Sequence, residues 1–320
     1  MKFCVLLLAF SFSACTANTA IPLEYPTPEP PPSATPLPKL ELRRDSELEK
    51  QFAEIAKDAK GKVGVAAVVL ETGEAALLNA DDHYAMQSVY KLPISMAVME
   101  QARLRKLDLD EKIGVTKEDF VKPGQASPLR DKNPSGGEFT IRELIRLALV
   151  ESDGTASDVL LRVAGGPSEV QSYLAQIGIR DIKVVNTEKE FAKDWNNQYQ
   201  NWATPLEAVR LLRSLRNEWT PEKGNEKKEL LLISYMLDAV TGPHRLKGLL
   251  PAGTGVAHKT GTSGSRGGIT AATNDIGIFY LPNGKHLAIA VFVADSPADE
   301  KTREGVIART AKAAWDRWCK

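Results

Sequence analysis

The chain has 320 residues, of which 43% are hydrophobic, and its 41 Lys and Arg residues balance its 41 Asp and Glu residues. This length allows one large domain or two ordinary domains with a substantial core. No segment combines basic with aromatic residues, which argues against a nucleic-acid partner. None of the four histidines stands at a metal-ligand spacing with Cys, Asp or Glu, so we expect neither a metal nor a cofactor.

Residues 1–20 predict a secretory signal peptide. The apolar run at 3–12 is too short to span a membrane as a helix. Cys15 follows small residues in an order that resembles a bacterial lipoprotein cleavage and acylation site, and ordinary cleavage near Ala17 or Ala20 is the alternative. We therefore expect export to the periplasm, with a lipidated Cys15 as a candidate membrane tether.

Residues 21–44 read as a proline-rich linker. Eight prolines fall between positions 22 and 38. Such a composition favours extended polyproline II structure and cannot build a core. A spacer of this kind suits an enzyme tethered through Cys15.

Ordered structure is expected from residue 45 onward. Ser46 and Glu49 have the spacing of a capping box at the start of a helix, which Gly61 ends. Two strands, 63–70 and 74–78, then form a hairpin.

Helical periodicity dominates the region 85–239. The helices that we expect are 88–104, one capped by Thr140 and Glu143, 155–163, 167–177, 205–215 and 227–239. This region is interpreted as an all-α domain.

Strand periodicity returns at 256–259, 269–273, 276–281 and 286–294, and Ser296 with Pro297 opens a last helix. Strands at both ends with helices between them predict an α+β fold. An antiparallel sheet built from both termini would be flanked by helices and would carry an inserted all-helical domain. The α/β domain would then be discontinuous, 45–84 and 240–320, around the all-α domain 85–239, with the functional site between the two.

Three short motifs can meet at that site. Ser88 and Lys91 lie three residues apart at the start of an expected helix, so the Lys91 amine can reach the Ser88 hydroxyl. Ser152-Asp153-Gly154 lies between two expected helices, and Lys259-Thr260-Gly261 ends an expected strand. Each motif alone occurs by chance, whereas the three in this order and in these settings point to one site with a nucleophile and its proton acceptor.

These motifs resemble those of the class A serine β-lactamases, namely S-x-x-K, S-D-N and K-T-G. Over residues 45–320 the resemblance implies hydrolysis of the β-lactam amide of penicillins and cephalosporins through an acyl-enzyme at Ser88, and hence antibiotic resistance. The alternatives are a D,D-peptidase or esterase of the same fold, or a non-hydrolysing penicillin-binding sensor lipoprotein. We expect a monomer whose partner is a small β-lactam substrate.

The resemblance also implies roles for single residues. Ser88 would be the nucleophile, and Lys91 or a water bound by Glu188 would take its proton. Ser152, helped by Lys259, would relay a proton to the leaving nitrogen. The other implied residues are the oxyanion hole, Ser88 and Thr262, and the substrate-binding set, Thr260, Gly261, Thr262, Ser263, Arg245 and Gly154.

The loop with the deacylating Glu departs from the family pattern E-x-x-x-N. Alignment backward from 198–202 assigns the Glu to Glu188, and the partner Asn then becomes Ala192. Glu190 is the alternative register.

Two further positions differ from the family. Gly154 stands where an Asn usually contacts Lys91 and the substrate amide. Ala126 stands where an aromatic residue at the entrance of the active site is common. We therefore expect a wide entrance that favours bulky cephalosporins.

Overall fold

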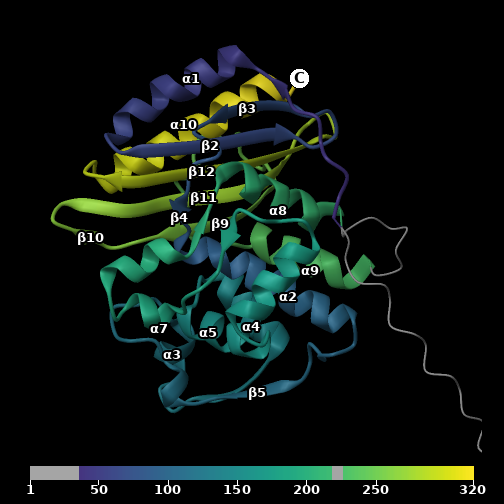
Figure 1. The fold of residues 1–320 in the computed structure, drawn as a ribbon, viewed down its shortest axis with the longest axis vertical. Coiled ribbons are helices and arrows are strands. Elements are labelled where there is room, and N and C mark those ends of the chain that lie inside the picture. The colour runs from purple at the N-terminus through teal and green to yellow at the C-terminus, as the bar shows by residue number, and fades with distance from the viewer. Residues whose placement is uncertain (1–35, 218–225) are drawn as a thin grey trace, which may run out of the picture. The chain divides into compact units, whose positions relative to one another are not determined.

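The centre of the protein, in a computed structural model, is a seven-stranded sheet with the strand order β1-β3-β2-β12-β11-β10, in which β9 also pairs with β11 (Figure 1). The strands are β1 Arg43–Arg44, β2 Lys62–Val69, β3 Glu74–Leu78, β9 Val256–Thr262, β10 Ser265–Arg266, β11 Ile269–Tyr280 and β12 His286–Ser296. Neighbouring strands are antiparallel, except that β1 runs parallel to β3. The predicted α+β fold, with a sheet drawn from both ends of the chain, is confirmed.

The structure describes residues 36–217 and 226–320. The expected signal peptide with Cys15, and most of the linker, lie outside the described residues. Among the described residues, no helix is both long and apolar enough to cross a bilayer.

Helices α1 Ser46–Ala56 and α10 Glu300–Trp318 cover one face of the sheet (Figure 1). Successive side chains of a strand point to opposite faces. Val63 and Val65 of β2 therefore join Phe52 of α1 in a core beneath these two helices. Ala66 and Val68 join the larger core on the other face.

The other face of the sheet is covered by the helical part of the chain, with α8 packed directly on β2 and β12. Its helices are α2 Lys91–Arg103, α3 Pro128–Lys132, α4 Ile141–Val150, α5 Gly154–Val163, α6 Pro167–Gln176, α7 Glu188–Phe191, α8 Pro205–Asn217 and α9 Glu226–Leu237. The short 3-10 helices of the chain are η1 Lys57–Ala59, η2 Gln87–Tyr90, η3 Lys117–Asp119 and η4 Trp195–Gln200.

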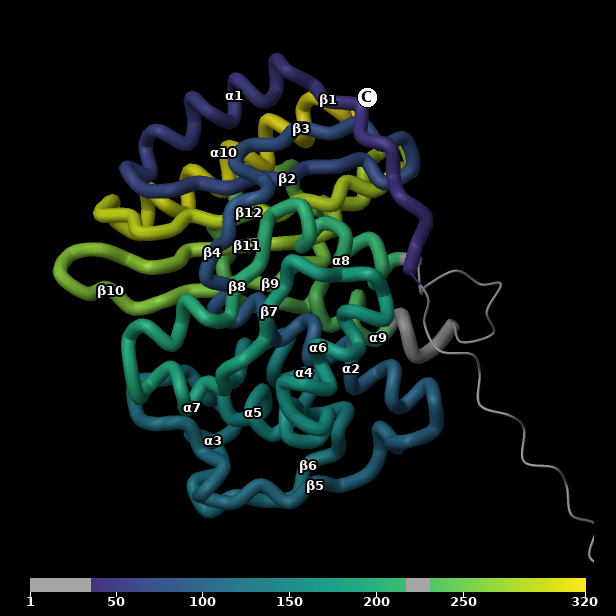
Figure 2. Tube along the Cα trace, viewed as in Figure 1, coloured from purple at the N-terminus to yellow at the C-terminus, as the bar shows by residue number. Residues whose placement is uncertain are grey.

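Two small sheets interrupt the helical part, and neither was predicted from the sequence. One has the order β4-β8-β7, and the other pairs β5 with β6 (Figure 2). Their strands are β4 Tyr84–Ala85, β5 Lys112–Val115, β6 Gly137–Thr140, β7 Ile182–Lys183 and β8 Trp202–Ala203. The division into an α/β domain at 45–84 and 240–320 and an all-α domain at 85–239 stays a prediction.

Two helix starts differ from the predictions. Asp45, not Ser46, caps α1, because its carboxylate accepts the Leu48 amide at 3.1 Å. Helix α10 begins at Glu300, since Ser296 is still paired within β12.

Strand β11 is one strand of 12 residues, where the sequence predicted two. The polar pair Asn274 and Asp275 lies between the two predicted strands, yet both residues are fully buried within β11. Asn274 Nδ2 donates to the carbonyl oxygens of Ala85 and Met86 at 2.8 and 3.1 Å, while Asp275 contacts His258. A buried polar side chain that finds such partners does not end a strand.

Gly64 generates a prediction on stability. A Cβ at this position would lie 2.4 Å from Tyr84 Cε2 and 2.8 Å from Pro205 Cγ, and Tyr84 is only 2% exposed. We expect Gly64→Ala to lower the free energy of unfolding by about 1–3 kcal/mol, because the buried ring must shift. Urea denaturation measures the loss. The control is Gly114→Ala in β5, where a Cβ meets nothing within 4 Å; equal losses in the two variants would contradict the prediction.

Candidate active site

Ser88 lies in the 3-10 turn η2, and not in the first turn of an α-helix as predicted, because α2 begins at Lys91. The preceding residue, Gln87, has a φ of 47°, a left-handed conformation that is costly for a residue with a side chain. Gln87 Nε2 donates to Gln198 Oε1 at 2.6 Å, and both side chains are buried. This contact holds the strained turn that carries Ser88.

Lys91 is buried, with 1% of its side chain exposed, and it has two polar partners. Its Nζ lies 2.9 Å from Glu188 Oε1 and donates to the carbonyl oxygen of Ser152 at 2.7 Å. Neither contact needs a side chain at position 154. The replacement of the family's Asn by Gly154 therefore does not leave the Lys91 ammonium without partners.

Lys259 is the second buried lysine at this place and is fully shielded from solvent. Its Nζ donates to Ser152 Oγ at 2.9 Å and to the carbonyl oxygen of Thr260 at 3.0 Å. Burial, reinforced by the charge of Lys91, lowers the pKa of Lys259 well below its usual range. Ser152 has a φ of 57°, so it too adopts the left-handed conformation.

Gly261 allows strand β9 to approach the turn that carries Ser88. A Cβ at position 261 would lie 2.2 Å from the carbonyl oxygen of Met86 and 3.2 Å from Gln87 Cβ. Only glycine permits this contact without a backbone shift. The glycine thus brings the residues that follow it, Thr262 and Ser263, to the same cleft as Ser88.

Most of the predicted site residues line a cleft of about 480 Å³. Those that line it are Ser88, Lys91, Ser152, Glu188, Thr260, Thr262 and Ser263, together with Ala126 and Ala192. Lys259, Gly261, Gly154 and Arg245 do not belong to the lining in the described part of the chain.

Arg245 lies behind the cleft and is 3% exposed. Its Nη2 donates to Thr262 Oγ1 at 2.9 Å, and its Nε lies 3.0 Å from Glu304 Oε1. The guanidinium therefore orients the Thr262 hydroxyl. Two residues earlier in the strand, Thr260 Oγ1 lies 2.6 Å from Thr241 Oγ1.

The two candidate glutamates have different surroundings. Glu188, 12% exposed at its side chain, faces Lys91. Glu190 forms a capping box with Thr187 at the start of α7, where its Oε2 accepts the Thr187 amide at 2.7 Å. The geometry therefore favours the register that aligns Glu188 with the deacylating Glu.

Asp158 and Gln125 hold the backbone of Glu188, and the sequence analysis named neither. Asp158 Oδ1 accepts the Glu188 amide at 2.7 Å, and its Oδ2 accepts the Lys189 amide at 3.1 Å. Gln125 Nε2 donates to the Glu188 carbonyl oxygen at 2.5 Å. Burial, and then the charge of Glu188, raise the pKa of Asp158 to about 7. Its position four residues after Gly154, on one face of α5, is the only signal in the sequence.

A buried pair that joins β9 to β11 was also missed. His258 Nδ1 lies 3.0 and 2.9 Å from the two carboxylate oxygens of Asp275, and both side chains are fully buried. The negative charge of Asp275 acts on Lys259 against the effect of burial. Asp275 therefore offsets part of the cost of burying that ammonium.

Comparison with known proteins agrees with this site. The model of the beta-lactamase enzyme family matches residues 47–318. The β-lactamase VEB-1 of Pseudomonas aeruginosa is 38% identical over 269 residues, which cover 84% of this chain and 89% of that relative. The extended-spectrum β-lactamase PER-1 of the same organism is 38% identical over 270 residues, which cover 84% and 86%.

A solved structure extends the similarity to the fold. The crystal structure of a β-lactamase from Chitinophaga pinensis is 40% identical, covers 85% of this chain and 99% of its own, and superposes with a TM-score of 0.81. Fold, cleft and relatives agree, and the chain therefore belongs to the β-lactamase enzyme family as a class A serine enzyme that hydrolyses β-lactams and so confers resistance.

Proposed function

We propose that Ser88 Oγ attacks the β-lactam carbonyl carbon, and that the C–N bond of the ring then breaks to leave an acyl group on Ser88. The observation that best supports this scheme is that Lys91 and Lys259 both donate to Ser152, while Glu188 contacts Lys91. The Ser88 proton passes through a water molecule to Glu188, or to the Lys91 amine after Lys91 has given a proton to Glu188. The 2.9 Å contact between these two groups is compatible with either base.

Ser152 protonates the leaving ring nitrogen in this scheme. Its hydroxyl already accepts a hydrogen bond from Lys259 at 2.9 Å, which supports a proton relay. Lys259, which donates to the Ser152 hydroxyl, returns a proton to it, and the proton taken from Ser88 replaces the one that Lys259 gives up. Acylation therefore ends with the Ser88 proton on the former ring nitrogen.

The substrate is held at the β9 side of the cleft. The backbone amides of Ser88 and Thr262 stabilise the developing oxyanion, a contribution worth about 100- to 1000-fold in rate for each donor. The hydroxyls of Thr260 and Thr262 bind the substrate carboxylate, with the charge of Lys259 behind them. Arg245 serves as a positioning residue for Thr262, with a hydrogen bond of 2.9 Å in support. Ser263 lines this edge of the cleft, whereas Gly261 acts behind it by letting β9 approach the turn that carries Ser88. Gly154, on α5, lies against Ala126 and Glu188.

Deacylation depends on Glu188. Its carboxylate takes a proton from the attacking water, the water oxygen bonds to the acyl carbon, and Ser88 Oγ leaves with a proton. Ala192 offers no polar side chain to the water. The bonds from Asp158 and Gln125 to the Glu188 backbone support a loop that keeps its position without the family's Asn.

The proposed substrates include bulky cephalosporins. Ala126 lines the cleft where an aromatic gate is common in the family. The relative PER-1 is named an extended-spectrum enzyme, which points in the same direction. We further propose that the protein acts as a monomer in the periplasm, tethered through a lipid on Cys15.

Glu188→Gln tests the deacylation step. We expect nitrocefin to acylate the variant, and turnover to fall by about 100-fold or more, because the amide cannot accept the proton of water. Stopped-flow absorbance and the intact mass of the Ser88 adduct measure the two steps. Glu190→Gln is the control and should continue to turn over. If Glu188→Gln hydrolyses at the wild-type rate with no adduct, the assignment of Glu188 is wrong.

Asp158→Asn tests the carboxylate that accepts the backbone amides of Glu188 and Lys189. The pKa of Asp158 is about 7 in the folded chain against 3.8 ordinarily, so the folded state binds more protons between these values. Its contribution to the free energy of unfolding therefore falls as the pH rises from about 4 to about 7, by up to about 4 kcal/mol.

Urea denaturation at pH 5 and pH 8 measures this contribution. The stability of the wild type relative to Asp158→Asn should be lower at the higher pH. The exposed Asp238 provides the matched control, Asp238→Asn. An equal difference between wild type and Asp158→Asn at both pH values would refute the prediction.

Labelling with radioactive palmitate tests the tether. We expect label in the wild-type protein and none in Cys15→Ala, because only a thiol at that position can receive the diacylglyceryl group. Equal labelling of the two proteins, or none in either, would rule out lipidation of Cys15.

A further inference from the structure

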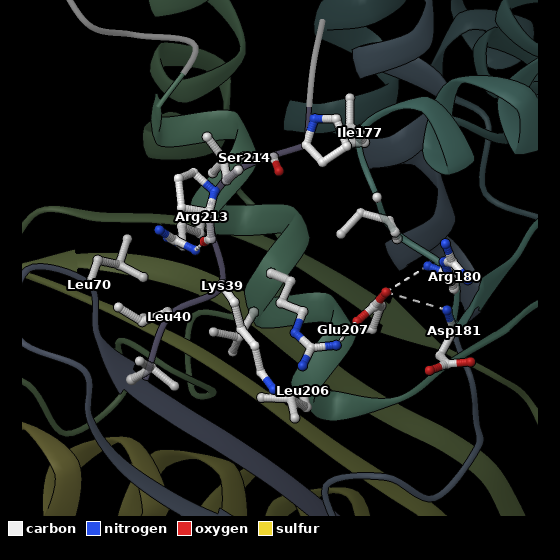
Figure 3. A pocket seen from close by; sticks show the side chains of 18 of the residues that line it. Lys39, Leu40, Leu70, Ile177, Arg180, Asp181, Leu206, Glu207, Arg213 and Ser214 are labelled. Atoms are coloured by element: carbon white, nitrogen blue, oxygen red, sulfur yellow. Dashed lines mark hydrogen bonds and ion pairs between the residues drawn. The ribbon is translucent and has the colours of Figure 1, made fainter. Parts of the chain in front are cut away.

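A second cavity, of about 620 Å³, lies apart from the active-site cleft and shares no lining residue with it. Its walls come from the N-terminal arm at 36–42, from β2, from the turn after α6 and from α8 (Figure 3). Cavities of about 300–1000 Å³ are large enough for drug-sized ligands. Nothing in the hydrolytic reaction uses this cavity.

The walls of the cavity are mainly apolar. Leu40 of the arm and Leu70 lie on one side, and Ile177 lies on the opposite side (Figure 3). Leu206 and Val209 of α8 complete this surface. Side chains from four separate segments thus enclose a space that an alkyl chain could fill, with a gain of about 25 cal/mol for each Å² of apolar surface removed from water.

The charged groups around the cavity favour an anion, since four are basic and two are acidic. One of the acids, Glu207, is 2% exposed and already engaged. Its Oε1 accepts the Arg180 amide at 2.6 Å, and its Oε2 lies 2.7 Å from Arg210 Nη1 (Figure 3). Glu207 is therefore not available to a cationic ligand.

Arg213 is the cation best placed to receive an anionic group. Its Nη1 donates to the carbonyl oxygen of Pro38 at 2.7 Å. Among residues 36–217 and 226–320, no carboxylate pairs with it. A guanidinium has five N–H donors, so further donors remain for a ligand. Burial lowers the pKa of Arg213, which indicates a partly desolvated site where an anion is bound more strongly.

We propose that this cavity binds one anionic amphiphile of the long-chain carboxylate class. The alkyl chain lies on Leu40, Leu70, Ile177 and Val209, and the carboxylate contacts Arg213. We assign a free molecule and not a lipid within a bilayer, because the arm at 36–42 forms one wall and a ligand must fit behind it.

The cavity also borders the base of the loop that carries Glu188. Asp181, in its wall, accepts the Thr204 amide on its carbonyl oxygen at 3.0 Å. Ile182 and Lys183 follow and pair with Ala203 and Trp202, which close the loop. A ligand held here would stabilise the folded state without touching the reacting groups.

Isothermal titration calorimetry tests the proposal. The mature protein, as it is processed in the cell, is titrated with dodecanoate below the critical micelle concentration. We expect one molecule bound per chain. Arg213→Gln should weaken binding by about tenfold, the effect of one lost charge-assisted hydrogen bond. Leu40→Asp, at a half-buried residue of the arm, should abolish binding through repulsion. The matched control is Arg309→Gln on α10, whose arginine pairs with Asp58 far from the cavity, and it should bind as the wild type does.

Several outcomes would overturn the proposal. They are the absence of dodecanoate binding, equal binding of dodecyltrimethylammonium, and affinities unchanged in both cavity variants. Capture on phosphatidylglycerol vesicles that depends on Arg213, without binding of free dodecanoate, would assign the site to a membrane lipid instead. Circular dichroism of each variant checks that the fold is intact. No readout here involves β-lactam hydrolysis, so the result is independent of the catalytic scheme.

Discussion

Two buried ammonium groups share one residue, and the active site is organised around that contact. Ser152 offers its carbonyl oxygen to Lys91 and its hydroxyl to Lys259, at 2.7 and 2.9 Å. Ser152 makes these two contacts in a left-handed backbone conformation, with a φ of 57°. Two like charges so close together and shielded from water are costly unless negative charge lies nearby. Glu188 supplies that charge to Lys91, and Asp275 acts on Lys259 from behind the strand.

The departures from the family pattern fall around Glu188. A Cβ at Gly154 would lie 3.1 Å from the carbonyl oxygen of Ala126 and 3.4 Å from Glu188 Cγ, so position 154 packs directly against the residue that faces Lys91. The backbone of Glu188 is held on both sides, by Asp158 at its amide and by Gln125 at its carbonyl oxygen. Bonds to the backbone do not depend on the side chain at Ala192. The carboxylate therefore reaches Lys91 even though both family asparagines are missing.

Sequence patterns succeeded where the physical cause is local, and failed where it is remote. The capping box of Thr140 with Glu143 was predicted and is present. Strand periodicity, by contrast, predicted two strands, 269–273 and 276–281, where the structure has the single strand β11 with Asn274 in its middle. The partners that satisfy Asn274 come from Ala85 and Met86, which lie 189 and 188 residues away along the chain. No local pattern contains that information.

The sequence by itself determined the order of the three motifs, the α+β class and the hydrolase family, because each is carried by residue types at short spacings. Only the tertiary structure decided which glutamate faces Lys91 and that Arg245 lies behind Thr262. It also formed the cavity beside α8. Helix caps and strand alternation act within a few residues. The contact from Lys259 to Ser152 spans 107 residues and exists only once the sheet and the helices have packed against each other.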